Sequence, residues 1–459
     1  MNYKLHSLVA ATLAGSMMMG FGANAMADST TDIVNALVAK GVLTEEEGSL
    51  LTKGREMESA VQVKAMKKAN KLSVSDAIDK AVVYGDIRVR AEQRNGEDAT
   101  GREKDRTRDR YKLTLGVKTE SGPFYTDLAL AMGSGGRSDN ATFGSGTNGD
   151  NKKESANIKR AMIGWHATDW LDLEAGRVKN PLYTTQMVWD GDLTFEGLVE
   201  KAHFKAGKSK IFLTAVQSQY LGDTQKYSGT ASATTDTIAN WIFAFQAGAE
   251  MPITDTVKGK AALTYSTYSN NRRAGTFAPA VGAGTSLGSN VVGTNNLRTI
   301  EIPAEINFKT SGALSYKVFG DFVKNLDGSD RAKEARLVTP ALNGTGSDDK
   351  AWLLGAGIAS QAGKKLAQGD WSAKIWYQDV GAYALDPNAV DSDFMDSKVN
   401  MEGVVFKSQY NLQENVFVSL AAGHGKRKND KLSTAGVGGD LGYNLKNMDL
   451  YQLDLTYKF

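Results

Sequence analysis

Apolar and polar side chains alternate with a period of two residues in segment after segment of this chain, from about residue 81 to its end. In the last segment one face carries Tyr451, Leu453, Leu455, Tyr457 and Phe459, and the other carries Gln452, Asp454, Thr456 and Lys458. Strands with one apolar and one polar face occur in soluble β-sandwiches and in the walls of membrane barrels. The pattern therefore predicts an all-β chain and leaves these two architectures to be separated.

About sixteen segments of this kind follow one another, each roughly the length that a tilted strand needs to cross a bilayer. They span 82–94, 110–120, 123–133, 157–167, 170–179, 196–206, 208–218, 239–250, 256–268, 299–309, 313–323, 350–361, 371–382, 400–411, 414–424 and 449–459. The connections between them alternate strictly between short and long. Ser121-Gly122 and Thr168-Asp169 are typical short turns, whereas 134–156 and 269–298 are long, polar and rich in Gly and Ser.

Short turns at one end and long loops at the other are typical of bacterial outer-membrane barrels. A soluble sandwich has no reason for such strict alternation. We therefore expect an all-β fold, a transmembrane antiparallel β-barrel of about 16 strands with a short N-terminal periplasmic helical segment. The closing Phe459 supports this choice, because it resembles the C-terminal aromatic signature of bacterial outer-membrane barrel proteins.

Composition agrees with a barrel and excludes several other classes. The mean hydropathy of −0.34 argues against helical membrane proteins only, because half of each barrel strand faces water. The 54 basic and 52 acidic residues exclude a nucleic-acid binder driven by gross basicity. With no Cys, the chain forms no disulfide scaffold, thiolate metal site or cysteine nucleophile.

The N-terminal part has a different pattern. Residues 1–27 combine Lys4, an apolar core and a small-x-small end, and we expect a signal peptide cleaved before Asp28 or after Ala25. Residues 28–80 show near-helical spacing, which suits either a two-helix hairpin on the barrel mouth or a periplasmic coiled coil that helps a trimer assemble. Residues 81–459 then form the barrel domain.

A barrel of this size leaves a water-filled lumen, so the side chains on the polar face decide what passes. The first two strands place a group of basic residues on that face: Arg88, Arg90, Arg94, Arg110 and Lys112. Together with acidic residues on other strands they would create a transverse field across the pore. Alternatively, most of these residues are solvated or paired wall residues.

The third long loop, residues 180–197, has a composition that a solvated loop does not need. Aromatic and apolar side chains such as Tyr183, Met187 and Trp189 predict that it folds against the inner wall. It would then form a constriction with candidate residues Arg177, Asp190, Asp192 and Glu196, the three acids facing the basic wall.

The stretch from Gly176-Arg177 through Asn180-Pro181 to Glu196-Gly197 resembles the bacterial outer-membrane porin family called "putative porin". The helical segment followed by a barrel is similar in layout to phosphate- and carbohydrate-selective porins. The resemblance implies a homotrimer of channels for small hydrophilic solutes and ions, embedded in outer-membrane lipid and lipopolysaccharide, with no cofactor, metal or nucleic-acid partner. It also implies a periplasmic N-terminal segment.

Other constellations in the sequence are weaker. A membrane-embedded hydrolase would need a Ser and an orienting group beside His166, His203 or His424, and no such motif is adjacent to them, so we expect no enzyme. Four acids, Asp386, Asp391, Asp393 and Asp396, crowd one long loop without EF-hand spacing, which predicts a solvated loop rather than a calcium site.

Three functions remain open. A general diffusion porin would show conductance, a substrate-specific porin for anions, phosphate or sugars would show saturable conductance, and a structural or adhesive barrel would show little.

Overall fold

The computed structural model describes residues 77–133, 138–145, 153–221, 240–269, 297–338, 343–344, 346–361, 363, 365–387, 389–391, 393–397, 399–432, 441 and 445–459. The expected signal peptide and nearly all of the expected helical segment lie outside these residues. The first described residue, Ala77, lies close to the expected start of the barrel at residue 81.

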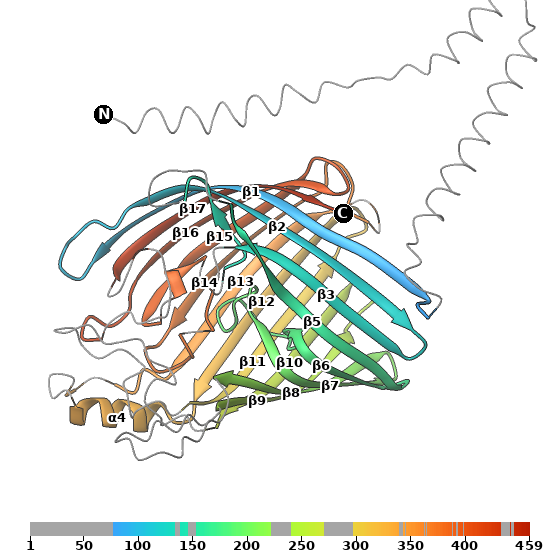
Figure 1. Cartoon of the computed structure of the whole chain (residues 1–459). Helices are drawn as coiled ribbons and strands as arrows, with labels where there is room; N and C mark the ends of the chain where they lie inside the picture. Colours follow the sequence, from blue (N-terminus) through green and yellow to red (C-terminus); the bar gives the residue numbers. More distant parts are fainter. Residues whose placement is uncertain are drawn as a thin grey trace, which may run out of the picture. The chain divides into compact units, whose positions relative to one another are not determined.

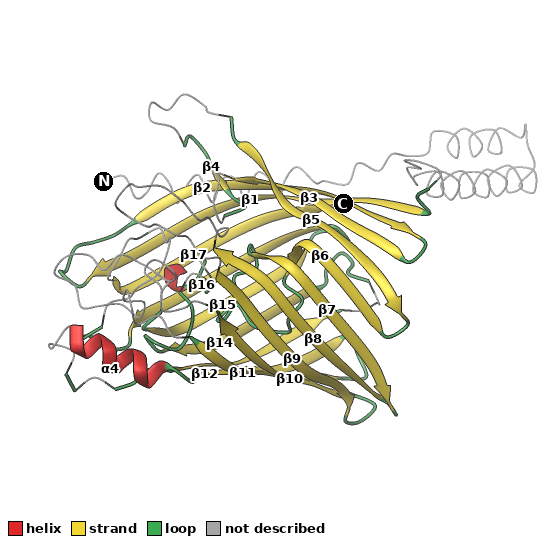
Figure 2. Cartoon of the chain, turned by 60° about the horizontal axis from the view of Figure 1, so that its bottom comes forward, coloured by secondary structure: helices red, strands yellow, loops and turns green. Residues whose placement is uncertain are grey.

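Strands dominate the described chain (Figures 1 and 2). They are β1 (Lys80–Asp98), β2 (Arg106–Ser121), β3 (Phe124–Gly133), β4 (Ala141–Thr142), β5 (Ser155–Thr168), β6 (Leu171–Lys179), β7 (Thr194–Ala206), β8 (Ser209–Leu221), β9 (Asn240–Pro252), β10 (Val257–Tyr268), β11 (Arg298–Lys309), β12 (Leu314–Asn325), β13 (Lys350–Ser360), β14 (Trp371–Val380), β15 (Met401–Asn411), β16 (Val416–Arg427) and β17 (Leu445–Lys458). The helices of this part are α4 (Gly328–Val338) and the short η2 (Met395–Ser397). In the residues that the structure describes, no helix is long and apolar enough to span a membrane.

The strands form one closed antiparallel barrel. Neighbours in the chain are neighbours in the sheet, and β1 pairs with β17 to close it. Leaving aside the two-residue β4, which pairs with β2, the wall has 16 strands. Each of the sixteen segments expected from the sequence overlaps one of these strands, so the all-β fold and the strand count are confirmed. The short β4 was not expected.

The seam between β1 and β17 includes the last residue of the chain. Val89 lies opposite Leu455, and Arg90 lies opposite Asp454. At one end of the seam, the Gly85 amide donates to the Phe459 carbonyl at 2.9 Å, and the Phe459 amide donates back to the Gly85 carbonyl at 3.1 Å. Phe459 is therefore part of the hydrogen-bonded wall rather than a free end.

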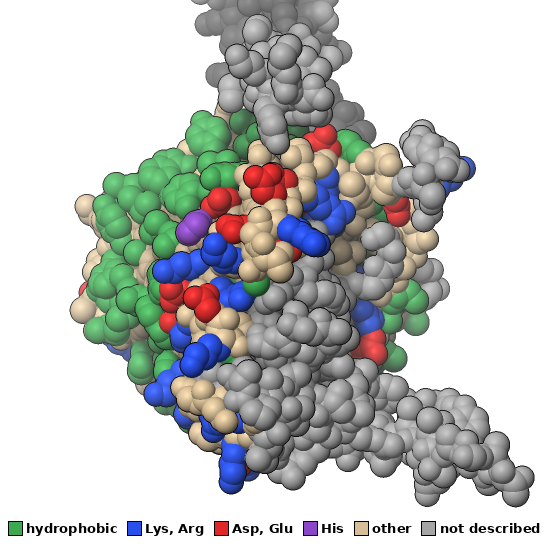
Figure 3. Space-filling view, turned by 90° about the vertical axis from the view of Figure 1, so that its left-hand side faces the viewer, with side chains coloured by type: hydrophobic (Ala, Val, Ile, Leu, Met, Phe, Trp, Pro, Cys, Tyr) green, Lys and Arg blue, Asp and Glu red, His purple; other side chains and the backbone are tan. Residues whose placement is uncertain are grey.

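The wall turns its apolar side chains outward and its polar side chains into the lumen. Ile163 is 62% exposed and Leu354 58% exposed on the outside, whereas lumen-facing Thr264 is only 1% exposed. Figure 3 shows hydrophobic side chains covering the outer wall in view, with Lys, Arg, Asp and Glu gathered at the centre. The period of two in the sequence is the cause, because successive residues of a strand face opposite sides.

Aromatic side chains mark both ends of the outer wall. Near the short turns, Trp170 stacks on Phe204 with ring centroids 5.5 Å apart, and Phe124 stacks on Trp165 at 6.1 Å. Towards the long loops, Trp352 and Tyr377 lie 5.3 Å apart. Between such rows the outer side chains are mainly aliphatic.

On the inner side, Tyr125 lies over a glycine of the neighbouring strand. A Cβ atom at Gly164 would lie 2.1 Å from the Tyr125 ring, so no larger residue fits there without moving it. The Tyr125 hydroxyl donates to Glu174 at 2.8 Å, which ties β3 to β6 across the intervening β5. Because Gly164 has no side chain, the Tyr125 ring can lie over β5, and its hydroxyl reaches Glu174 on β6.

We expect Gly164→Val to displace Tyr125 and lower the free energy of unfolding by about 1–3 kcal/mol, the usual cost of overpacking. Urea titration of the purified barrel, followed by tryptophan fluorescence, measures this change. Gly346→Val is the control, since a Cβ at Gly346 has no neighbour within 4 Å and should leave the midpoint unchanged. Equal midpoints for the two variants would show that the Tyr125 contact contributes nothing.

Candidate functional site

The loop between β6 and β7, residues 180–193, folds into the lumen and crosses to the far wall. The Tyr183 amide donates to Gln246 Oε1 of β9 at 2.9 Å, and Gln246 Nε2 donates back to the Tyr183 carbonyl at 2.9 Å. Thr184 donates to Glu301 of β11 at 2.5 Å, and Thr185 to Asp321 of β12 at 2.6 Å. These bonds hold the loop inside the barrel, as its aromatic composition predicts. We call residues 180–193 the first loop.

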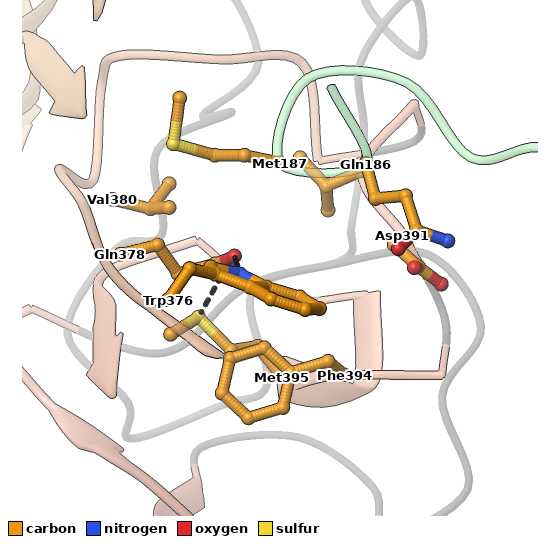
Figure 4. Close-up of a pocket in the computed structure, with 9 residues that line it drawn as sticks. Gln186, Met187, Trp376, Gln378, Val380, Asp391, Phe394 and Met395 are labelled. Carbon is orange, nitrogen blue, oxygen red and sulfur yellow. Dashed lines mark hydrogen bonds between the residues drawn. The ribbon is translucent and has the colours of Figure 1, made fainter. Parts of the chain in front are cut away.

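A second loop, residues 381–400 between β14 and β15, docks onto the first. The Asp190 amide donates to the Ala389 carbonyl at 2.6 Å, and the Asp391 amide to the Gln186 carbonyl at 3.3 Å. Met187 of the first loop packs with Phe394 of the second in one buried apolar cluster (Figure 4). The lumen is thus narrowed by two loops that support each other.

The expectation of a solvated loop over these residues was wrong. Phe394 is 4% exposed and Asp396 is fully buried. Among the residues with described positions, no group of acids or histidines is placed to hold a metal ion. The apolar residues next to these acids, Leu385, Val390 and Met395, were the available signal, and they are the same kind of signal that identified the first loop.

Arg90 of β1 links the wall to the second loop. Its guanidinium binds the Asp454 carboxylate of β17 through two hydrogen bonds, of 2.7 and 2.9 Å, and Asp393 of the second loop at 3.0 Å. Arg90 is only 4% exposed. Bidentate pairs between an arginine and carboxylates are among the stronger polar contacts in proteins, so this contact helps to hold the loop in place.

Arg94, four residues further along β1, makes a second link between the wall and the second loop. Its guanidinium contacts Asp396 of the second loop at 3.0 Å and Glu92 of its own strand at 3.1 Å. Arg108 of β2 adds a contact to Glu92 at 2.6 Å. With Arg94 1% exposed, these charges are compensated inside the protein rather than presented to passing solutes.

The other basic candidates on β1 and β2 also face the interior. Arg88 lies 3.5 Å from Asp454 and is bonded to Asn140; Arg110 donates to Ser138 at 3.1 Å; Lys112 lies 3.5 Å from Asp139. The five basic wall residues are therefore close to acids or hydrogen-bond acceptors. The structure places them beside the loops, several of them in structural pairs.

Two of the three acidic candidates, Asp190 and Asp192, belong to the first loop. Asp190 is 6% exposed within the first loop, and its carboxylate accepts the Asp192 amide at 2.9 Å. Asp192 lies 3.9 Å from the ammonium of Lys159 on β5. Both acids therefore lie inside the barrel at the constriction.

Arg177 and Glu196 lie on the outer face and bind each other there. Arg177 shares its face of β6 with Leu173 and Ala175, and it is the register partner of Glu196 on β7. The structure does not bring this pair together with the wall arginines, so neither residue belongs to the constriction.

Beside the docked loops the lumen contains a cavity of about 560 Å³. Its wall comes from β1 and from the strands β11 to β17. The lining carries three lysines, Lys317, Lys374 and Lys407. Lys407 was not among the sequence candidates, because its relation to Lys374 depends on strand register, which one sequence does not show.

The pKa values of two acids of the second loop shift in opposite directions. Desolvation among the packed loops raises the pKa of Asp391 to about 7; Asp393 and Asp190 add to the shift, and Lys407 opposes it. Desolvation acts on Asp393 in the same direction, but Arg90, Lys407 and Arg94 outweigh it and hold the Asp393 pKa well below its usual range. Asp393 is therefore the permanent anion and Asp391 the one that changes charge near neutrality.

A family of known proteins matches the part of the chain that carries the first loop. The model of the family described as "Putative porin" matches residues 86–276, which include the strands β1 to β10. The resemblance inferred from residues 176–197 is confirmed, since that stretch lies within the matched span.

The match to this family and the closed 16-stranded barrel support the porin channel expected from the sequence. Among solved structures, the chain is similar to the outer membrane channel DcaP of Acinetobacter baumannii, with 13% identity and a TM-score of 0.42. The alignment covers 84% of this chain and 99% of that one. No curated protein sequence matches the chain.

We expect the ion preference of this porin to shift towards anions between pH 8 and pH 6. Because the folded-state pKa of Asp391 is about 7, this carboxylate binds a proton as the pH falls through that range, and the constriction gains about one positive charge. Reversal potentials in a KCl gradient at both pH values measure the shift.

Asp391→Asn should remove most of this pH response, whereas Glu414→Gln, at an exposed turn, should retain it. The two variants share every other titratable group of the chain, so the difference between their pH responses isolates Asp391. An unchanged response in Asp391→Asn would contradict the assignment.

Proposed function

We propose that this chain forms a water-filled channel through the bacterial outer membrane, by which ions and small hydrophilic solutes diffuse passively. The observation that carries the proposal is the contrast between an apolar outer wall and a charged lumen with a cavity of about 560 Å³. A soluble protein of this shape would expose aliphatic side chains over its whole circumference. Each such side chain gains about 1.5–3 kcal/mol when removed from water.

Membrane insertion is supported by the arrangement of the outer wall. Exposed aliphatic residues such as Ile163 and Leu354 lie between aromatic rows, and a bilayer matches this order because tyrosine and tryptophan prefer the interfaces. In our proposal the short turns and the N-terminal segment face the periplasm, and the two-loop constriction controls the size of passing solutes.

A channel agrees better with the contacts of the histidines than a hydrolase does. His166 shares a hydrogen bond of 2.6 Å with Asp172, and His424 one of 2.8 Å with Asp449. Both imidazoles are largely exposed. Each pair contains a base and an orienting acid, but among the residues that the structure describes no serine or threonine hydroxyl is hydrogen-bonded to either imidazole.

The homotrimer implied by the resemblance finds support in one patch of the outer wall, formed by Arg177, Glu196, Glu200 and Gln217. Glu200 lies between the exposed Phe204 and Leu198 on the outer face of β7, and its carboxylate accepts Gln217 Nε2 at 3.0 and 3.2 Å. Charged groups on a lipid-facing strand are destabilising. Contact with a second copy of the chain would remove this patch from lipid.

Purified full-length protein should give stepwise conductance in planar bilayers. Asp393→Asn, which weakens the contact between Arg90 and the second loop, should increase conductance or its fluctuations, because that loop then leaves its position more often. Asp330→Asn on α4 is the matched control. A folded, heat-modifiable protein that never conducts would contradict the channel and favour a structural or adhesive barrel.

The oligomer proposal is tested by Glu200→Leu. If the patch lies between protomers, the apolar side chain should lower the oligomer fraction in mild detergent, measured by native gel electrophoresis or light scattering. Ala422→Leu on the outer face of β16 should leave that fraction unchanged. A more heat-stable barrel with an intact oligomer would place Glu200 in lipid and contradict the proposed contact.

A further inference from the structure

A row of lysines crosses the inner wall beside the cavity. Lys374 of β14 and Lys407 of β15 are direct register partners, so their side chains leave the sheet side by side towards the lumen. On the other side of Lys374, the partner on β13 is Gly357, and the partner of Gly357 on β12 is Lys317. Three basic residues therefore lie on one line across four strands, with one position that has no side chain.

A direct pair of like charges is unfavourable for a sheet, because opposed side chains of an antiparallel pair are roughly 5 Å apart at Cβ. At several such positions this wall pairs opposite charges. Arg90 faces Asp454 across the seam, and Lys260 faces Glu305 between β10 and β11. Three like-charge pairs, Lys205–Lys210, Lys324–Lys350 and Asp379–Glu402, lie within two residues of strand ends. The pair Lys374–Lys407 differs from them because it lies further inside its two strands.

Within the described part of the chain, neither ammonium has a carboxylate within 4 Å. The Lys407 ammonium donates to the neutral Gln186 of the first loop at 3.0 Å. The two ammonium groups lie 5.2 Å and 5.6 Å from the centroid of the Trp376 ring, which stabilises them only in part. Lys317 differs, because it binds Glu305 at 2.5 Å.

The acids nearest to this row have other partners. Asp393 and Asp454 also line the cavity, but both are bound to Arg90. Asp391 of the second loop acts on Lys407 through its field without a bond to it. The cavity wall thus keeps an excess of positive charge, which the fold does not use for its own stability.

The remaining lining of the cavity consists largely of small polar side chains. Ser372 and Gln409 share the inward face with the lysines on β14 and β15, Ser419 does so on β16, and Asn307 does so on β11. Hydroxyl and amide groups can donate to further oxygen atoms of a bound anion. A hydrated site of this kind binds weakly enough to release its ligand, as a channel requires.

We propose that the lumen contains a binding site for small multivalent oxyanions, in which Lys374 and Lys407 hold one ligand between them. This inference rests on the proposed channel function and adds the solute class. A dianion suits two adjacent ammonium groups better than a monoanion, since both charges are then compensated at once. Phosphate and short dicarboxylates share this chemistry.

The test is inhibition of single-channel chloride current by added malonate, inorganic phosphate, acetate or glucose. Malonate or phosphate should block in a saturable way, at concentrations at least fivefold lower than acetate, and glucose should not block. Comparing the half-blocking concentrations of malonate and phosphate shows whether the site prefers carboxylate or phosphate groups. If wild-type protein conducts but all anions act alike, the site is absent although the channel exists; if it never conducts, the proposed function itself fails.

Substitutions test whether Lys374 and Lys407 are the residues that cause the block by malonate. Lys374→Gln together with Lys407→Gln should raise the half-blocking malonate concentration at least tenfold. Lys374→Arg with Lys407→Arg should keep most of the block. Lys210→Gln with Lys258→Gln removes the same charge from inward positions of β8 and β10, and it should change little. If both glutamine pairs lost the block equally, the block would depend only on the overall charge of the lumen, and the proposed binding site would be contradicted.

Discussion

In a closed wall one strand thick, every side chain of a strand must face either the lumen or the outside. The rest of the structure depends on this constraint. It makes a two-residue sequence period sufficient to build an apolar outer wall and a polar lumen from the same strands. It also means that neighbouring residues of a strand face different surroundings: on β6 the side chain of Val178 is buried inside the barrel, whereas that of Arg177 lies on the outer face.

The strands could be predicted because their signal is local. Alternation and turn residues located all sixteen long strands, but not the two-residue β4, which has too few residues to show a period. The parity of Arg177 was also present in the sequence, since Leu173 and Ala175 alternate with Asp172 and Glu174. Arg177 was assigned to the constriction because it is charged, although the alternation of its neighbours places its side chain on the apolar face.

Other parts of the site depend on contacts between distant segments. The second loop has more buried apolar residues than the first, but its acids suggested solvation. Those acids have arginine partners about 300 residues earlier in the chain, Arg90 for Asp393 and Arg94 for Asp396. The adjacency of Lys374 and Lys407 follows from hairpin register, and that register depends on the connection between β14 and β15. A single sequence contains the residues of these contacts but not their pairing.

The seam has a consequence for how the molecule is made. Ile87 meets Tyr457 across it, so the final ladder joins strands from opposite ends of the barrel sequence. No part of that ladder can form until β17 has been synthesised, and before then β1 carries an edge of unpaired amide and carbonyl groups. Contacts so distant in sequence form slowly. Until β1 and β17 meet, both strands therefore keep an edge that can pair with another chain, and this is a stage at which the molecule is prone to aggregate.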